Sequence, residues 1–360
     1  MAKLGELGKI ITGNTPKTSD AQNYESNDIC FVKPSDFKDS KITEIHQSEF
    51  YISEYAKDKA RVLPADSILV TCIGIIGKVA INKVPCAFNQ QINAIIPERK
   101  ICDPRYVAYA IQNMQPQMQN TANAAVVPIL NKTQFSNIEI PLPSLEAQKQ
   151  IACNLNKIDR LIFLRKQQLA KLDELVKAQF VEMFGDPYMN NKHYPLRKGE
   201  SFFKLSNGKT VPEDKRLSNG VPAYGGNGIS WYTNESLFNH DTIVVGRVGF
   251  QSGNVHIAKG PLWITDNAMY MSSCDFSQYN LIFLINLMEH IDFTKFQDAG
   301  DLKKITQKPF MQYEYICPPL PLQNQFAAFV ERVDQRKQTV QQSLEKLELM
   351  KKALMQEYFG

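Results

Sequence analysis

The feature that most constrains the fold is an internal duplication, in which two stretches of the chain match at an offset of 175 residues. Residues 143–185 laid over 318–360 share about fifteen identities without a gap. The same offset aligns "ADSILVTCIG" (65–74) with "HDTIVVGRVG" (240–249). Self-similarity over such distances is typical of one structural unit written twice. The chain is therefore predicted to carry an internal two-fold pseudo-repeat.

Each repeat is predicted to end in a long helix. Residues 144–184 and 322–359 contain no Gly or Pro, and their apolar residues recur every three or four positions. At about 1.5 Å per residue each helix would be about 60 Å long, and an apolar stripe of that length needs a partner. We expect the two helices to pack on each other as an antiparallel coiled coil.

The remaining segments are predicted to be globular domains of mixed α and β structure. Short β-rich runs such as "SILVTCIGIIGKVAI" alternate with Gly, Asn and Pro turns, and short helices are expected over residues 103–114 and 277–290. The fold class is α+β. The predicted order is a domain at 1–143, a long helix at 144–185, a second domain at 186–317 and a second long helix at 318–360.

Composition narrows the function only slightly. No apolar run approaches the roughly 20 residues needed to span a bilayer, and we expect a cytoplasmic protein with no membrane partner. The seven cysteines are scattered without a CxxC pair, so reduced thiols are expected instead of a zinc or redox site. A net charge of +4 does not by itself indicate a nucleic-acid binder.

Motifs for catalysis are weak. "NGKT" (207–210) lacks the earlier glycine of a phosphate-binding loop, and the five histidines have no metal-ligand spacing. Asp66, Glu98 and Lys100 faintly imitate the Asp…Glu-x-Lys set with which nucleases hold a metal ion, although Asp66 more simply reads as a turn residue before a strand. A self-contained DNA-cleaving enzyme with a metal site at these three residues stays open as the alternative function.

Four stretches carry a resemblance to a known family over nearly the whole chain. "IPLPSLEAQKQIA" (140–152), "MFGDP" (183–187), "GNTPKTSDAQNYESNDICFVKPSDF" (13–37) and the run from "PAYGGNGIS" to "WITDNAMY" (222–270) resemble the DNA-specificity subunit of Type I restriction-modification systems. In that family two target-recognition domains alternate with two long helices, which matches the order of the predicted segments.

The resemblance implies a function and partners. Each target-recognition domain, here 1–143 and 186–317, would read one half of a split site in double-stranded DNA, and the helices would fix the gap between the halves. Two modification subunits, which bind S-adenosylmethionine and methylate adenine, would flank the helices. ATP-dependent restriction subunits, which use ATP and Mg, would join them. The chain itself would be non-catalytic and would hold no cofactor or metal.

Base readout requires amide, basic and aromatic side chains on loops that a rigid scaffold holds. Candidate DNA-binding residues in the first domain are Asn14, Thr15, Lys17, Ser19, Lys33, Ser35, Asn89, Gln90 and Gln91. Candidates in the second domain are Asn207, Lys209, Tyr224, Asn227, Trp231, Arg247, Gln251, Asp266 and Asn267. The Lys and Arg side chains among them are expected to touch phosphate in preference to bases.

Overall fold

The chain forms two compact units, each of which contains part of both long helices. The computed structural model describes residues 1–38, 41–121, 128–210, 212–298, 300 and 303–360. Unit 1 consists of Met1–Lys166 together with Gln342–Gly360, and unit 2 consists of Gln167–Gln341. Unit 1 is therefore built from two separated stretches of the chain, whereas unit 2 is continuous.

The two long helices are α4 (Leu145–Phe184) and α7 (Leu320–Phe359), each of 40 residues, as the sequence predicts. The apolar stripe predicted for α4 is buried or half-buried along its length. Its members are Ile151, Leu155, Ile158, Ile162, Leu169, Leu172, Val176, Phe180 and Met183.

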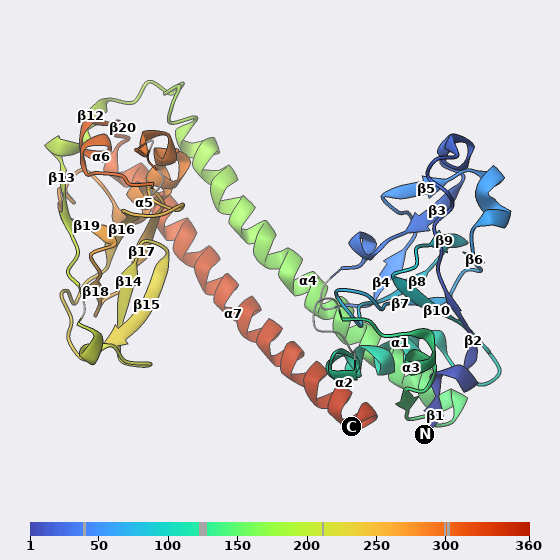
Figure 1. Cartoon of the computed structure of the whole chain (residues 1–360). Helices are drawn as coiled ribbons and strands as arrows, with labels where there is room; N and C mark the ends of the chain where they lie inside the picture. The colour runs from blue at the N-terminus through green and yellow to red at the C-terminus, as the bar shows by residue number, and fades with distance from the viewer. Residues whose placement is uncertain (39–40, 122–127, 211, 299, 301–302) are drawn as a thin grey trace. The chain divides into compact units, whose positions relative to one another are not determined.

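Ion pairs fix the direction in which α4 and α7 pack. In unit 1, Asp159 Oδ1 lies 2.7 Å from Lys351 Nζ, and in unit 2, Asp173 Oδ1 lies 2.6 Å from Lys337 Nζ. Positions later in α4 thus meet positions earlier in α7, which confirms the predicted antiparallel arrangement (Figure 1).

Unit 1 is built around two sheets, with strand orders β2-β10-β7-β8-β4 and β5-β3-β9-β6, and a small β1-β11 pair. Its strands are β1 (Ala2–Lys3), β2 (Gly8–Thr12), β3 (Ile29–Val32), β4 (Thr43–Ile45), β5 (Phe50–Ile52), β6 (Val62–Leu63), β7 (Ile68–Thr71), β8 (Val79–Asn82), β9 (Cys86–Phe88), β10 (Ile92–Pro97) and β11 (Glu139–Ile140). Its helices are α1 (Pro104–Asn113), α2 (Gln115–Thr121) and α3 (Lys132–Ser136). The apolar face of α1 lies in one core with the five-stranded sheet and the start of α4.

Unit 2 has sheets of order β13-β19-β16-β17 and β15-β14-β18, with a small β12-β20 pair. Its strands are β12 (Leu196–Lys198), β13 (Phe203–Asn207), β14 (Val221–Gly225), β15 (Gly228–Thr233), β16 (Thr242–Gly246), β17 (Val255–Ala258), β18 (Trp263–Ile264), β19 (Ala268–Cys274) and β20 (Glu314–Ile316). Its short helices are α5 (Leu281–His290) and α6 (Lys308–Gln312). Helices α1 and α5 confirm the two short helices predicted from sequence.

Two buried glutamines at equivalent positions of the repeat make the same hydrogen bonds in both units. Gln148 and Gln323 are fully buried near the starts of α4 and α7. Each side-chain oxygen accepts a hydrogen bond from the N-cap residue of the unit's short helix, Asp103 N at 3.0 Å and Asn280 N at 2.9 Å. Each amide nitrogen donates to two backbone carbonyls. The same network thus joins a long helix to a domain in both units.

The far end of each long helix completes the core of the other repeat. Phe184 of α4 packs against Phe283 and Phe326 in unit 2, with ring centroids 4.7 and 5.5 Å apart. Its duplicate Phe359 of α7 packs against Tyr106 of α1 in unit 1 at 5.3 Å. Both phenylalanines are buried, so burial of apolar surface holds each helix end in place.

None of the helices formed by the described residues is both long enough and apolar enough to cross a lipid bilayer.

Candidate nucleic-acid interface

Three loops of unit 1 meet at one edge of its sheets. Backbone hydrogen bonds join the end of β2 to the β9–β10 turn through Gly13 N and Ile92 O at 3.0 Å, and through Asn14 N and Phe88 O at 3.0 Å. A third bond joins Cys72 N of the β7–β8 hairpin to the O of Gln91 at 2.8 Å. We call residues 13–15, 72–78 and 89–91 the loop edge of unit 1.

The equivalent loops of unit 2 meet in the same way. Gly208 N donates to Ala268 O at 3.0 Å, and Lys209 N donates to Ile264 O at 2.8 Å. The β16–β17 hairpin joins them through Arg247 N and the O of Asn267 at 3.0 Å. Residues 207–209, 247–254 and 265–267 form the loop edge of unit 2.

Glycine is required where the loop after β2 approaches the β9–β10 turn in unit 1, and where the loop after β13 approaches the β18–β19 turn in unit 2. A Cβ added to Gly13 would lie 2.1 Å from Asn89 O, and one added to Gly208 would lie 2.1 Å from Thr265 O. Any larger residue would force the two backbones apart. Both loop edges therefore depend on the same close approach of main chains.

Candidates on the loop edge of unit 1 are brought together, but several are engaged internally. Asn14 donates to Lys59 O at 2.8 Å and accepts from Arg61 N at 2.9 Å. Asn89 is only 7% exposed and bonds to Gln91 through both its amide nitrogen and its oxygen. The side chains of Thr15 and Gln90 are exposed and bond to each other at 2.7 Å. Thr15 and Gln90 are thus the candidates of this edge whose side chains remain exposed.

The other candidates of unit 1 lie beside this edge. Lys17 and Ser19 are exposed in the segment after β2. Lys33 follows β3 and holds its ammonium 3.1 Å from the centroid of the Phe50 ring. Ser35 donates to Glu49 at 3.2 Å, so its hydroxyl is engaged with the segment before β5.

In unit 2 most candidates converge. Asn207 accepts from Gln307 at 3.4 Å, and Arg247 donates a 3.3 Å hydrogen bond to the backbone oxygen of Asp266. Lys209, Gln251, Asp266 and Asn267 are exposed on the loop edge. The backbone oxygen of Tyr224 accepts from Thr265 N at 2.9 Å, which joins β14 to the loop at 265–267.

Trp231 and Asn227 lie on the β14–β15 hairpin. Trp231 pairs with Ala223, and the guanidinium carbon of Arg216 lies 4.2 Å from the centroid of its ring. Asn227 is exposed in the turn, where the adjacent Gly226 approaches Gly246 of the β16–β17 hairpin. Asn227 therefore belongs with the loop edge, whereas Trp231 is set back along the strand.

Two exposed apolar residues lie on the loop edges, where the sequence predicts only polar, basic and aromatic contacts from other positions. Ile75 is 59% exposed on the β7–β8 hairpin, and Phe250 is 90% exposed on the β16–β17 hairpin. They are 175 positions apart, and each follows a glycine with positive φ, Gly74 and Gly249. A glycine followed by a large apolar residue at both points of the repeat is the sequence pattern that marks these two positions.

The alternative metal site gains no support from the surroundings of Asp66. One carboxylate oxygen lies 2.9 Å from Lys83 Nζ and the other 3.1 Å from a guanidinium nitrogen of Arg99. The hydrogen bond from Lys83 holds the pKa of Asp66 below its usual range. Two cations thus occupy the positions a metal ion would take, and Asp66 adopts the predicted turn conformation before β7, with φ 62°. Within the described part of the chain, no group of three or more His, Cys, Asp or Glu side chains is arranged to hold a metal ion.

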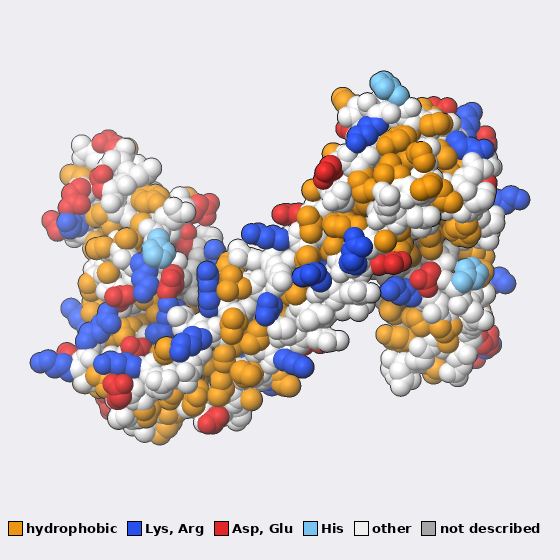
Figure 2. All heavy atoms as spheres, turned by 180° about the vertical axis from the view of Figure 1, so that it is seen from behind, with side chains coloured by type: hydrophobic (Ala, Val, Ile, Leu, Met, Phe, Trp, Pro, Cys, Tyr) orange, Lys and Arg blue, Asp and Glu red, His pale blue; other side chains and the backbone are white. Residues whose placement is uncertain are grey.

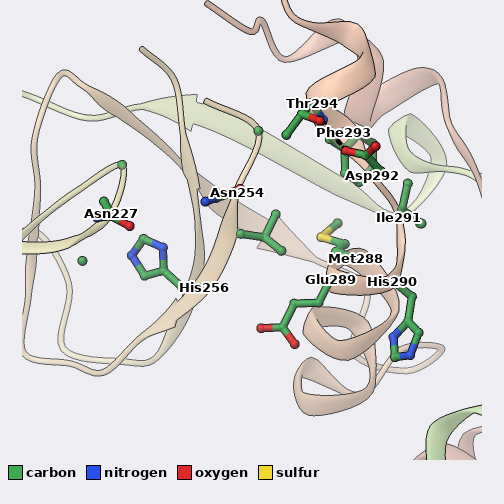
Figure 3. Close-up of a pocket in the computed structure, with 14 residues that line it drawn as sticks. Asn227, Asn254, His256, Met288, Glu289, His290, Ile291, Asp292, Phe293 and Thr294 are labelled. Atoms are coloured by element: carbon green, nitrogen blue, oxygen red, sulfur yellow. Dashed lines mark hydrogen bonds between the residues drawn. The ribbon is translucent and has the colours of Figure 1, made fainter. Parts of the chain in front are cut away.

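A cavity of about 470 Å³ lies beside the loop edge of unit 2 (Figure 3). It is lined by the β14–β15 turn, the start of β17 and the end of α5. Figure 3 shows Asn227 and His256 on one side, with Glu289 of α5 pointing toward the His256 side and His290 turned away. Burial lowers the pKa of His256. The wall beside Asn227 is therefore neutral near pH 7.

Charge is mixed over the surface. Figure 2 shows Lys and Arg side chains of both units interspersed with Asp and Glu on the face that it draws. A mixed surface of this kind agrees with the net charge of +4.

Comparison with known proteins points to one family. A family model, Type I restriction modification DNA specificity domain, matches residues 1–174 and 192–349. The MjaIX specificity subunit of Methanocaldococcus jannaschii is 30% identical over 229 residues, which cover 59% of this chain and 53% of that protein. The EcoprrI specificity subunit of Escherichia coli is 20% identical over 353 residues, 92% of this chain and 86% of that protein. The matched region is thus about half the length of the first relative and most of the second.

Solved structures share the fold. The S subunit of a Type-I restriction-modification system from M. genitalium matches with a TM-score of 0.68 at 15% identity, over 99% of this chain and 95% of that one. A chain from a structural study of complex assembly in the type I R-M system matches with a TM-score of 0.59 at 14% identity, over 99% and 96%. Because the family model spans both units and most of their residues, the chain belongs to the family of Type I restriction modification DNA specificity domains.

Proposed function

We propose that this chain is the DNA-recognition subunit of a Type I restriction-modification complex, and that each loop edge reads one half of a bipartite site in double-stranded DNA. The observation that carries the proposal is the repeated construction of the two loop edges, in which the same backbone bonds gather polar and basic side chains from three loops. Two like edges with different side chains suit two half-sites of different sequence.

The partners follow from this role. Two modification subunits carry S-adenosylmethionine and methylate adenine, and restriction subunits with ATP and Mg complete the cleaving complex. The chain itself is non-catalytic and holds no cofactor. Its modest net charge of +4 favours weak DNA binding by the isolated chain, since phosphate contacts supply most non-specific affinity. The partner subunits then contribute the rest of the phosphate contacts.

The long helices are proposed to set the gap between the half-sites. Each runs 40 residues without a break, and ion pairs hold α4 against α7 in both units. Such a pair resists bending better than a loop linker would.

The test is methylation mapping with domain exchange. The chain is co-expressed with its modification subunits, and methylated adenines are mapped by sequencing. Replacing residues 1–140 with the matching segment of a relative should change one half of the methylated site and leave the other half unchanged. A change in both halves, or no site-specific methylation by the natural complex, would contradict the proposal.

The nuclease alternative has its own test. The purified chain is incubated with plasmid and Mg²⁺ or Mn²⁺. We expect no cleavage, whereas cleavage that Glu98→Ala abolishes would establish the enzyme.

A further inference from the structure

We propose that Ile75 and Phe250 are apolar wedges, each of which packs against the bases of its own DNA half-site. This inference rests on the proposed function and adds residues that a search for polar contacts omits. Both side chains are exposed, Phe250 to 90% and Ile75 to 59%. Single exposed apolar side chains are ordinary on protein surfaces, but these two lie at equivalent points of a duplicated fold, which favours a shared binding role.

Both wedges stand on hairpins that are closed by the same bonds. In unit 1, Gly77 N donates to Thr71 O at 2.9 Å, and in unit 2, Gly253 N donates to Gly246 O at 2.8 Å. The segment before α3 supports the hairpin of unit 1, and the segment before α6 supports the hairpin of unit 2. Residues Gly74 and Gly249 donate to Pro128 O at 3.1 Å and to Lys303 O at 2.8 Å.

The hairpin of unit 2 has a further support. The side-chain amide of Gln297 donates to Phe250 O at 3.4 Å and to Ser252 O at 2.6 Å. A positive φ of 93° at Gly249 turns the chain just before the wedge. The backbone that carries the exposed ring is thus fixed, so binding would cost little ordering of the loop.

The neighbours of Phe250 favour DNA over a protein partner. In the chain, Phe250 lies between Arg247 and the exposed Gln251. The exposed Lys303 and Lys304 lie beside the hairpin, where Lys304 pairs with Val248. One apolar side chain among cations and amides is too small for a protein-docking patch, but it matches the apolar wedges that DNA-binding proteins insert among bases.

The wedges lie where base contact is already proposed. The backbone N–H of Cys72 donates to Gln91 O, and that of Arg247 donates to Asn267 O. Each hairpin is therefore part of its loop edge. A wedge placed there would hold its half-site in register while polar neighbours read base edges.

The test uses the complex assembled with modification subunits. We compare DNA affinity and methylation for the natural chain, Phe250→Ala, Phe250→Gln and Ile75→Ala, with Phe276→Ala as control. Phe276 is 58% exposed in unit 2 but lies after β19, away from the loop edge. Both Phe250 variants should weaken site-specific binding about tenfold to a hundredfold, as expected for loss of base stacking. Phe276→Ala should match the natural complex.

Two further readouts separate a wedge from other roles. The slope of log affinity against log salt should stay unchanged in the Phe250 variants, because no phosphate contact is lost. Sequence preference should relax only in the half-site read by the altered unit, so Ile75→Ala and Phe250→Ala should affect opposite halves.

Three results would overturn the inference. They are unchanged affinity and methylation in both Phe250 variants, relaxed preference in both half-sites, or failure of the variants to assemble with modification subunits. Failure of the natural complex to methylate a specific site would instead refute the proposed function.

Discussion

Gln148 and Gln323 make equivalent sets of hydrogen bonds 175 positions apart, each linking a long helix to the N-cap of a short one. Both side chains are fully buried, so removing either would leave backbone groups without partners.

Gln148→Ala is expected to destabilise unit 1 by about 2 kcal/mol, because the N–H of Asp103 and two carbonyls lose their bonds. Hydrogen exchange should rise in α1 and at the start of α4 while unit 2 stays protected. The exposed Gln150 provides the control, since Gln150→Ala should change stability by less than about 0.5 kcal/mol. Equal exchange in both variants would mean that the network does not stabilise the junction.

Phe359→Ala is expected to loosen the end of α7 from unit 1. The ring packs 5.3 Å from that of Tyr106, and its loss should cost about 3 kcal/mol, the lower end for a buried phenylalanine because a helix end can relax. Thermal unfolding and protease sensitivity of the last turn report the change. Leu349→Ala on the same helix alters an exposed side chain and should leave both unchanged. A similar loss in the two variants would contradict the packing role of Phe359.

Lengthening both helices tests their proposed role in spacing. Arg165 Nε donates to Ser343 Oγ at 3.2 Å, so one residue of each chosen heptad, 165–171 and 340–346, contacts the other. Duplicating both heptads adds about 10 Å to each helix, close to three base pairs of DNA. Three pairs also rotate one half-site by roughly 100° around the DNA axis. Methylation mapping should find a gap longer by two to three pairs or a loss of methylation, and full methylation at the original gap would disprove the spacing role.

Neutral His256 should contribute stability to unit 2 that is lost as the solution becomes acidic. Burial lowers the pKa of His256 below its unfolded value of about 6.5, so the unfolded chain takes up a proton first. The neutral ring faces Tyr224 at 5.9 Å and shares its cavity with Glu289, His290 and Asp292. The stabilisation is complete above pH 6.5 and is lost as pH falls toward the folded pKa.

The measurement is the melting temperature between pH 5 and pH 8. In His256→Gln the drop on acidification should be smaller than in the natural chain, whereas His46→Gln, at an exposed position, should keep the full drop. Parallel curves for all three proteins would rule out the contribution of His256.

Sequence predicted the long helices well because their signals are local. The spacing of residues such as Leu155 and Phe180 and the absence of Gly and Pro fix both element and buried face. The sequence identified the loops, but it could not show which of their side chains are engaged in internal hydrogen bonds. Asn14 bonds to residues more than 40 positions away, and only the folded chain shows that its amide is occupied. The exposure of Ile75 and Phe250 was not predicted, because apolar residues are ordinarily assigned to a core.

The discontinuity of unit 1 sets an order of folding during synthesis. Domains generally fold as they emerge from the ribosome, the first-made before the later ones. Residues 167–341 include everything in unit 2, whereas unit 1 needs residues 342–360, which are translated afterwards. We therefore expect the part of the chain made first to be completed last, when Phe359 packs onto Tyr106.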